Sequence, residues 1–321
     1  MKAAHASLCA VALLACAVMP TRADYPEKPL RLVVPFPPGG STEPLARILS
    51  QKLGEAFGQQ LIIDNRPGAG STIGAEIVAK SPPDGYTLFL GSISNAISAA
   101  LYPKLNFDIV RDFAPVTLLA TTPGVLVVHP ALPVKTVKEL IALAKARPDQ
   151  LAYSSAGNGT PPHLSAELLS GMTGIKLIHV PYKGGGPSII ALLSGEAQLS
   201  IASLPSAIGH MRSGKLRALG VTTPQRTPSA PELPTIAESG VPGYAAETWL
   251  GLAVAARTPK EIVVKLHAAT VKAMTLPDVK ERLDALGYIA RVGSPEVYAN
   301  FVQSEVDKWR RVVKAANVRV D

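Results

Sequence analysis

The stretch that decides the fold is LRLVVPFPPGGSTEPLARIL, which spans residues 30–49. Its first part, residues 30–34, is apolar except for one arginine and predicts a buried strand that ends before Pro35. Residues 36–42 are rich in proline and glycine and predict a turn. Pro44 suits the first turn of a helix, and the leucines and isoleucine after it recur at helical spacing. A strand, a glycine-rich turn and a helix in succession are typical of α/β proteins with parallel sheets.

The same succession recurs along the rest of the chain. Further strands are predicted at residues 60–64, 86–90, 125–128, 151–154, 176–180, 198–202, 216–221 and 249–254. Helices are predicted between them, two of which begin at Pro161 and Pro187. Because the pattern restarts near residue 125, the 321 residues predict two α/β units, each a mostly parallel sheet flanked by helices.

Local signals add detail to these elements. Thr136 and Thr258 are each followed three residues later by a glutamate, the spacing of a capping box at a helix start. We expect Ile73 to face inward from the helix that follows the second glycine-containing turn. Residues 223–243 are rich in proline and serine and predict a long surface connection. The last helix is expected to bury Val297, Phe301, Val306, Trp309 and Val313.

The composition indicates a compact globular protein without a nucleic-acid partner. Hydrophobic residues make up 47% of the chain and charged residues 17%, which favours a large core and excludes a disordered chain. The net charge is +8, but the lysines and arginines are spread out, without a basic block or an aromatic stripe between them. A solvated basic surface is therefore the simpler interpretation, and its mild positive field would help to capture anionic solutes.

The first 23 residues have the features of a cleaved export signal. An early lysine precedes the apolar residues 8–18, and a small residue stands before the expected mature start at Asp24. Both cysteines, Cys9 and Cys16, lie inside this segment, so the mature chain would have no disulfide, which favours a bacterial periplasm. The alternative is a lipoprotein, because residues 13–16 resemble a lipobox and a lipid on Cys16 would tether the protein to a membrane.

Three glycine-rich turns each lead into an expected helix, at residues 36–42, 156–160 and 183–186. The start of a helix exposes unpaired backbone N–H groups, and glycine lets a ligand approach them closely. Such turns are suited to hold a small anion without reacting with it. The alternative is structural, because turns between strands and helices use glycine and serine in any case. His163, just past the second turn, suits either local hydrogen bonding or a ligand contact.

The sequence contains no pattern typical of a catalytic or metal site. Residues 68–74 have the spacing GxGxxxG, one residue too long for the dinucleotide fingerprint. No P-loop lysine follows a glycine turn, no GxSxG elbow is present, and the six histidines lack metal-ligand spacing. We therefore expect no cofactor, no metal and no enzymatic activity.

A set of longer motifs resembles a known family. The motifs are DYPEKP (24–29), VPFPPGGST (34–42), NRPGAG (65–70), PPDGYTL (82–88), GNGTPPHL (157–164) and VPYKG (180–184). In this order, and over nearly the whole mature chain, they resemble the substrate-binding components of tripartite tricarboxylate transporters, the periplasmic Bug or TctC family. The resemblance implies a two-lobed clamshell of the type II-like periplasmic-binding-protein fold. Lobe 1 would contain residues 24–122 and 250–321, lobe 2 residues 123–249, and the ligand would lie between them.

The resemblance also implies how a ligand is held. Carboxylate groups of a small organic acid would accept hydrogen bonds from backbone N–H and hydroxyl groups, partly through water. The candidate ligand-binding residues are Phe36, Pro38, Gly39, Gly40, Ser41, Thr42, Glu43, Ser92, Ser94, Asn95, Ala156, Gly157, Asn158, Gly159, Thr160, His163, Tyr182, Lys183 and Ser203. The expected partners are this ligand and membrane transporter subunits, and the protein itself is expected to be a monomer. The alternative role is an exported sensor subunit of a signalling system.

Two positions depart from the family pattern. Glu43 stands where the first turn usually has aspartate, and Ala202 stands near a position where many members have aspartate. The absence of that second carboxylate removes one candidate partner for a ligand ammonium group. An amino-acid ligand is therefore a weaker expectation than a simple carboxylate.

Overall fold

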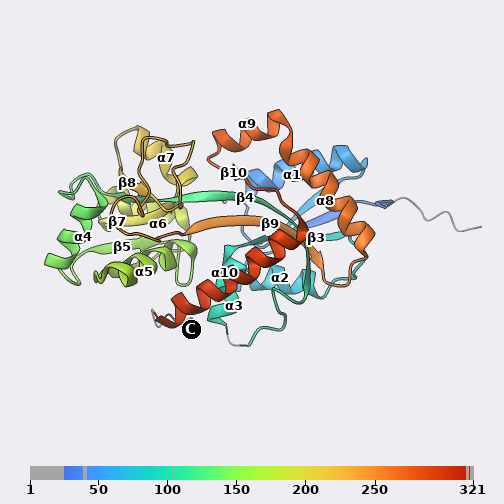
Figure 1. Cartoon of the computed structure of the whole chain (residues 1–321), viewed down its shortest axis with the longest axis horizontal. Helices are drawn as coiled ribbons and strands as arrows, with labels where there is room; N and C mark the ends of the chain where they lie inside the picture. The colour runs from blue at the N-terminus through green and yellow to red at the C-terminus, as the bar shows by residue number, and fades with distance from the viewer. Residues whose placement is uncertain (1–24, 39–41, 103, 316–317, 319–321) are drawn as a thin grey trace, which may run out of the picture.

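The computed structural model describes residues 25–38, 42–102, 104–315 and 318 (Figure 1). The expected export signal and the mature start at Asp24 lie outside the described residues, as do Gly39, Gly40 and Ser41 of the first turn.

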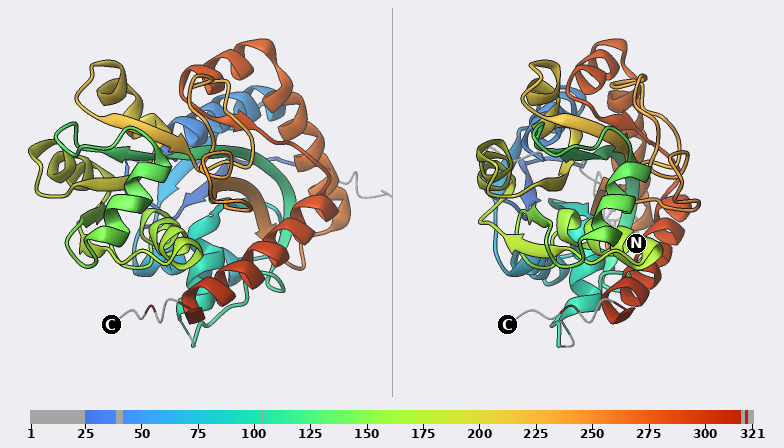
Figure 2. Two further views of the ribbon diagram at one scale, coloured as in Figure 1. Left: turned by 60° about the vertical axis from the view of Figure 1, so that its left-hand side comes forward. Right: turned by 90° about the vertical axis from the view of Figure 1, so that its left-hand side faces the viewer.

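Within the described residues, ten strands form one curled sheet that runs through the whole molecule (Figures 1 and 2). The strands are β1 (Leu30–Val34), β2 (Leu61–Asn65), β3 (Thr87–Ser92), β4 (Phe113–Val128), β5 (Ala152–Ser155), β6 (Ile178–Pro181), β7 (Leu199–Ser203), β8 (Arg217–Val221), β9 (Glu247–Ala255) and β10 (Ile289–Ala290). Their order is β2-β1-β3-β9-β4-β7-β5-β6, and β8 and β10 also pair with β4.

Helices pack along this sheet on both of its faces (Figure 2). The helices are α1 (Glu43–Phe57), α2 (Thr72–Ala79), α3 (Ile93–Leu101), α4 (Val137–Ala146), α5 (Pro161–Thr173), α6 (Gly185–Ser194), α7 (Leu204–Arg212), α8 (Lys260–Thr275), α9 (Pro277–Ala285) and α10 (Pro295–Ala315), with a 3₁₀ turn η1 (Ala69–Ser71) before α2. The starts of α5 at Pro161 and of α6 close to Pro187 agree with the positions at which the sequence predicts helices.

The alternation of side chains along β1 explains why helices are needed on both faces. Leu30, Leu32 and Val34 pack into a core cluster with α1 and α8, whereas Val33 packs into a separate cluster with α2. All four of these side chains are buried. A strand that is apolar on both faces is stable only when both are covered, as in the interior of an α/β sheet.

β4 is much longer than the strand predicted at residues 125–128. It begins at Phe113 and contains Pro115 and Pro123, which in isolation indicate the end of a strand. The pairing with β9 is irregular between Pro115 and Thr117 and between Leu118 and Ala120, and Pro123 is the last residue of β4 that pairs with β9. After Pro123 the partners of β4 change from β9 to β7 and β8.

This change of partners divides the sheet into two halves. We call β1, β2, β3, β9 and residues 113–123 of β4 the first half, and β5 to β8 with residues 124–128 of β4 the second half. Figure 1 shows β4 and β9 side by side where the chain crosses from one half to the other.

Some local predictions were wrong. Ile73 and Val297 are 46% and 60% exposed, because they lie on the outer faces of α2 and α10. Thr258 does not cap α8, since its hydroxyl donates to the Ala255 carbonyl at 2.7 Å. Thr136 does accept from a backbone N–H of the first turn of α4, as predicted. The predicted surface connection at residues 223–243 is partly buried, because Ile236 and Val241 within it are 0% and 3% exposed and pack into the core of the second half.

The C-terminal helix α10 is joined to β9 by a buried carboxylate. Glu305 is 6% exposed, and its Oε2 atom accepts from the indole N–H groups of Trp249 at 3.0 Å and Trp309 at 3.1 Å. Its other oxygen forms an ion pair with Lys308. Val306 and Val313 are buried as predicted, and Phe301 is partly buried against the same cluster. This contact fixes α10 beside the crossing strand.

Candidate functional site

The carboxyl ends of the parallel strands in the two halves point toward each other. β1 and β3 are parallel, and β9 is antiparallel to both β3 and β4, so β4 runs in the direction of β3 and continues into the second half. β7 is antiparallel to β4, and β5 and β6 are parallel to β7, so these three strands run back toward the first half. Ligands of open α/β sheets bind at the carboxyl ends of the strands. The topology therefore places two such edges opposite one another.

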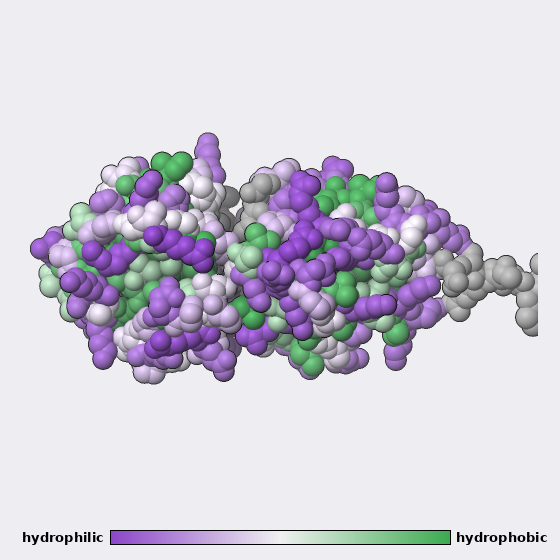
Figure 3. All heavy atoms as spheres, turned by 90° about the horizontal axis from the view of Figure 1, so that it is seen from above, coloured by the Kyte–Doolittle hydropathy of each residue, from purple (hydrophilic) through white to green (hydrophobic). Residues whose placement is uncertain are grey.

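The register of β4 indicates how far apart the two edges lie. Ser92 ends β3 and pairs with Leu250 of β9, which in turn pairs with Ala120 of β4. Ser203 ends β7 and pairs with Gly124 of β4. Four residues of extended chain span about 13 Å, which leaves room for a small molecule between the edges. The outline of the molecule also narrows between the two halves in the space-filling view (Figure 3).

The predicted site residues that the structure describes lie at or just after these carboxyl ends. The described residues of the first turn, 36–38 and 42, follow β1, and Ser94 and Asn95 follow β3. The turn at residues 156–160 follows β5, Tyr182 and Lys183 follow β6, and Ser203 is the last residue of β7. The fold thus brings the residues of each half to one edge of that half.

Most polar groups of the turn after β5 already form hydrogen bonds within the protein. The Gly157 N–H donates to Ser155 Oγ at 3.1 Å, and the Gly159 N–H donates to His163 Nδ1 at 2.9 Å. The N–H and the hydroxyl of Thr160 both donate to the Gly157 carbonyl, at 3.3 and 2.7 Å. The predicted donation from Gly157, Gly159 and Thr160 to a ligand is therefore not supported. Among the described residues, the backbone N–H groups of Ala156 and Asn158 have no hydrogen-bond partner.

Glycine is required at two positions of this turn. Gly157 has φ 128° and Gly159 has φ 70°, both in a region that residues with a side chain rarely adopt. A Cβ atom at Gly157 would also lie 3.3 Å from the Tyr182 carbonyl. The two glycines let the chain reverse within a few residues and enter α5.

His163 is a buried structural residue rather than an exposed ligand contact. It is 6% exposed, and its ring stacks on that of His179 with centroids 3.9 Å apart. His179 also stacks on Tyr153, at 4.8 Å, and its Nε2 is 2.6 Å from Ser155 Oγ. Burial lowers the pKa of His163 to about 4. Burial, together with the nearby His163, lowers the pKa of His179 to about 4 as well, so both rings are neutral at pH 7.

The first turn ends in two buried polar atoms. Thr42 is 7% exposed and precedes α1, but its side chain does not cap that helix. Within the described part of the chain, Thr42 Oγ1 and Glu43 Oε2 have no hydrogen-bond partner, while Glu43 Oε1 forms an ion pair with Arg47 at 2.7 Å. The carbonyl of Phe36 accepts from the Asn65 side chain at 2.9 Å, which ties the turn to the end of β2. A buried hydroxyl without a partner is a candidate ligand contact.

After β3, the polar side chains mainly build the start of α3. Ser92 and Asn95 are each 1% exposed and form a capping box, in which Ser92 N donates to Asn95 Oδ1 at 2.9 Å. The Asn95 amide donates to Ser71 Oγ at 2.9 Å. The structure therefore gives Ser92 and Asn95 a capping role and leaves the half-buried Ser94 as the candidate contact in this segment.

The remaining predicted residues lie on the second half. Ser203 precedes α7, and its hydroxyl is 2.8 Å from that of Ser206. Lys183 is exposed and Tyr182 is half-buried, after the edge strand β6. Pro38 is exposed at the end of the described part of the first turn.

The sequence analysis missed the residues that shape the turn from behind. These are Tyr153, Ser155, Glu167 and His179, of which Tyr153 donates its hydroxyl to Glu167 Oε1 at 2.6 Å. A weak signal was present, because Glu167 follows His163 by one helical turn and His179 lies on the neighbouring strand β6.

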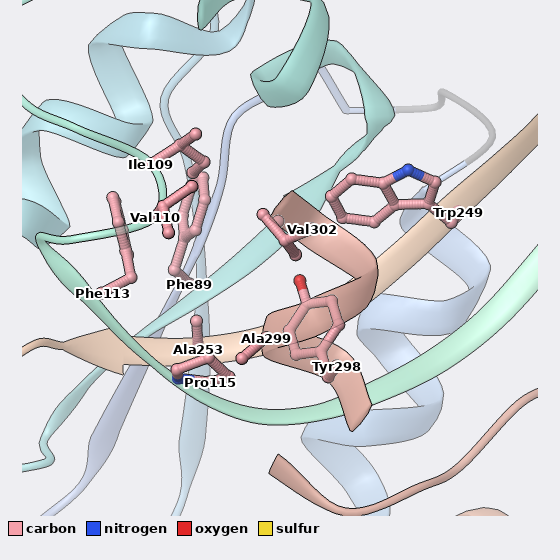
Figure 4. A pocket seen from close by; sticks show the side chains of 11 residues that line it. Phe89, Ile109, Val110, Phe113, Pro115, Trp249, Ala253, Tyr298, Ala299 and Val302 are labelled. Carbon is pink, nitrogen blue, oxygen red and sulfur yellow. The ribbon is translucent and has the colours of Figure 1, made fainter. Parts of the chain in front are cut away.

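A separate cavity lies in the first half, under α10 (Figure 4). It has a volume of about 80 Å³ and is lined mostly by apolar side chains, among them Phe89, Phe113 and Trp249. Its lining includes no predicted site residue, and a buried tyrosine, Tyr298, forms part of its wall. We interpret it as a packing cavity of the core.

The described residues contain no helix long and apolar enough to cross a membrane. They also contain no group of three or more histidine, cysteine, aspartate or glutamate side chains that could hold a metal ion.

Comparison with known proteins identifies the family. The family described as "Tripartite tricarboxylate transporter family receptor", TctC, matches residues 45–318. BugT of Bordetella pertussis is 36% identical over 304 residues, which cover 94% of this chain and 93% of BugT. A protein encoded in the tcbD–tcbE intergenic region of a Pseudomonas species is 40% identical over 305 residues, 94% of this chain and 91% of that protein.

Solved structures agree with this assignment. A structure of an R. palustris protein with adipate is 38% identical and has a TM-score of 0.84, covering 92% of this chain and 99% of that chain. MatC from Rhodopseudomonas palustris with bound malate is 34% identical with a TM-score of 0.80, covering 90% and 100%. The periplasmic binding protein BugD is 32% identical with a TM-score of 0.81, covering 92% and 99%. These neighbours confirm the periplasmic-binding-protein fold, and the chain belongs to the TctC family of tripartite tricarboxylate transporter receptors.

Proposed function

We propose that the protein captures a small organic acid between the facing strand ends and delivers it to a tripartite tricarboxylate-type membrane transporter. The observation that carries the proposal is the pair of opposed carboxyl edges, with Thr42 on one edge and the Ala156 and Asn158 N–H groups on the other. Hydrogen-bond donors of this kind suit a carboxylate better than a cation. Adipate and malate in two neighbouring structures support this ligand class.

The proposed arrangement is a clamshell whose two lobes meet at the crossing strands. The first lobe contains residues 24–122 and 250–321, and the second contains residues 123–249. The change of β4 partners after Pro123 supports this division. Two extended connections between the lobes would serve as a hinge, because few residues would need to change their backbone angles for closure.

We also propose that the protein works in the periplasm. The features of residues 1–23 support export, and processing before Asp24 would release the mature protein, whereas lipid on Cys16 would tether it. The structures of periplasmic binding proteins among its neighbours support the same compartment. The protein would bind and release its ligand unchanged.

The ligand class is tested by thermal shift of residues 24–321 against a panel of mono-, di- and tricarboxylates that includes adipate and malate. A cognate acid stabilises only the folded protein, so the gain is about 2.7 kcal/mol at 100 times its dissociation constant. The apparent melting temperature should rise further with concentration. If no carboxylate of the panel changes it, the protein is not a carboxylate receptor.

A matched pair of variants tests the site itself. Thr42→Val removes a hydroxyl that has no partner among the described residues, so stability should be unchanged while the affinity for the acid found in the panel falls about tenfold or more. Thr270→Val is the reciprocal control, because that buried hydroxyl donates to the Leu266 carbonyl at 2.7 Å in α8. It should lower stability by about 1 kcal/mol and leave affinity unchanged. Wild-type affinity in Thr42→Val would remove Thr42 from the site.

A further inference from the structure

Two stacked histidines, the buried His163 and the half-buried His179, support the turn at residues 156–160 from behind. Their rings are nearly parallel, with 8° between the planes, and each ring holds a different part of the turn. His163 Nδ1 accepts from the Gly159 N–H, and His179 Nε2 bonds to Ser155 Oγ, which also accepts from the Gly157 N–H. The two rings therefore control the middle and the start of the same short loop.

The bond to His163 requires one particular form of the ring. Nδ1 can accept a hydrogen bond only when it carries no proton, so the neutral ring must carry its proton on Nε2. Nε2 of His163 lies 3.9 Å from Glu167 Oε1, and that oxygen already accepts from the Tyr153 hydroxyl at 2.6 Å. A positive charge on either ring is disfavoured by burial and by the second ring stacked against it.

The backbone N–H groups of the turn therefore differ in whether they are already hydrogen-bonded within the protein. Two of its backbone N–H groups are held by Ser155 and His163, and a third, that of Thr160, is held by the Gly157 carbonyl. The N–H groups of Ala156 and Asn158 are the ones without a partner among the described residues. If Gly159 were released, its N–H would compete with them, and the loop would lose the contact that fixes its path.

We propose that His163 and His179 are positioning residues, which fix the turn at residues 156–160 so that the Ala156 and Asn158 N–H groups are presented to the ligand carboxylate. The inference rests on the proposed function, since it assumes that this turn receives the anion. Neither histidine touches the ligand. Tyr153 and Glu167 hold the stack in place from β5 and α5.

The first test needs no ligand. Nuclear magnetic resonance of protein labelled with ¹⁵N in the histidine rings, at pH 7, reports which ring nitrogen of His163 carries the proton. We expect a proton on Nε2 and a bonded, unprotonated Nδ1, with a pKa well below the ordinary value of 6.5. A protonated Nδ1, or titration like that of an exposed histidine, would overturn the proposal.

The second test compares variants by calorimetry with adipate and malate as probes. Asparagine places an amide oxygen near the position of Nδ1, so His163→Asn should keep the affinity within about twofold, while His163→Leu weakens it about fivefold or more. Because His179 Nε2 bonds to Ser155 Oγ, His179→Gln and His179→Leu are compared in the same way. His210→Leu, in α7 and outside the stack, should bind like the wild type.

The outcomes separate this inference from the proposed function. If the wild type binds a probe and His163→Leu binds it equally well, the histidines do not position the turn, although the receptor function stands. Equal loss in His163→Asn and His163→Leu, with both folded, would exclude the acceptor role. If the wild type binds neither probe, the ligand class is in question, and the ring protonation still decides whether His163 holds Gly159.

Discussion

Gly251→Ala tests how the C-terminal helix packs on the sheet. Gly91 of β3 and Gly251 of β9 are paired, and the buried ring of Tyr298, from α10, lies against both. A Cβ atom at Gly251 would lie 2.2 Å from the Cζ and hydroxyl oxygen of Tyr298 and 2.6 Å from Cε2. The backbone of Gly251 is not in the left-handed region, so the ring is the obstacle to alanine.

The cost follows from the size of this overlap. Carbon atoms in contact lie about 3.5–4.0 Å apart, so the ring or the strand would have to move by more than about 1 Å. Tyr298 is 3% exposed, and the cavity beside it offers the ring some room to move. Overpacking of this kind costs about 1–3 kcal/mol, and we expect about 3 kcal/mol because several ring atoms are affected. In Gly91→Ala, the Cβ atom would lie 3.2 Å from the Tyr298 hydroxyl, so that variant should lose less than about 1 kcal/mol.

The coupling energy between Gly251→Ala and Tyr298→Ala is measured by urea unfolding. The proteins compared are the wild type, the two glycine variants, Tyr298→Ala and the double variant Gly251→Ala/Tyr298→Ala. Removal of the ring should relieve most of the Gly251→Ala penalty, so the coupling should be about 2 kcal/mol. The reasoning is refuted if Gly251→Ala unfolds like the wild type. It is also refuted if its penalty is the same with and without the Tyr298 ring.

Two further predictions concern buried polar groups. Glu305→Leu leaves the indole N–H groups of Trp249 and Trp309 without their acceptor and should lower the free energy of unfolding by about 2–6 kcal/mol. Glu305→Gln keeps an oxygen at this position and should cost less. Equal urea midpoints for Glu305→Leu and the wild type would contradict this prediction. His163 and His179 have pKa values lowered from 6.5 to about 4, so between these pH values the unfolded chain binds more protons and stability falls as the pH falls. The loss is up to about 3 kcal/mol for His163 alone, and His163→Asn should flatten the dependence of the melting temperature on pH; an unchanged slope would show that His163 does not titrate in this way.

Local signals predicted the elements whose boundaries depend on neighbouring residues. The start of α5 at Pro161 and the cap of α4 at Thr136 need only a few adjacent residues, because proline fixes its own φ and a threonine hydroxyl reaches N–H groups of the next turn. The burial of β1 is likewise predicted by its own five residues, four of which are apolar. These are interactions within one turn or one strand, so they are encoded where they occur.

Other features depended on partners far along the chain. Pro115 and Pro123 resemble strand ends, yet β4 continues through them because it pairs with β9, more than 120 residues further along the chain, and after Pro123 with β7 and β8. The exposure of Ile73 and Val297 was also mispredicted, because apolar spacing does not show which side of a helix receives a neighbour. The extent of β4 and the exposure of these two side chains both depend on partners that lie far away in the sequence.

The same distinction applies to the site. The sequence by itself determined the α/β class, the glycine-rich turns after strands, and the family, because composition, periodicity and motif order are properties of the chain alone. Only the tertiary structure decided that the strand ends of the two halves face one another, since this follows from the antiparallel pairing of β4 with β7 and β9. It also decided which turn donors have partners: the bond between Ser155 and His179 joins residues 24 apart, and such a partner exists only after the strands have paired.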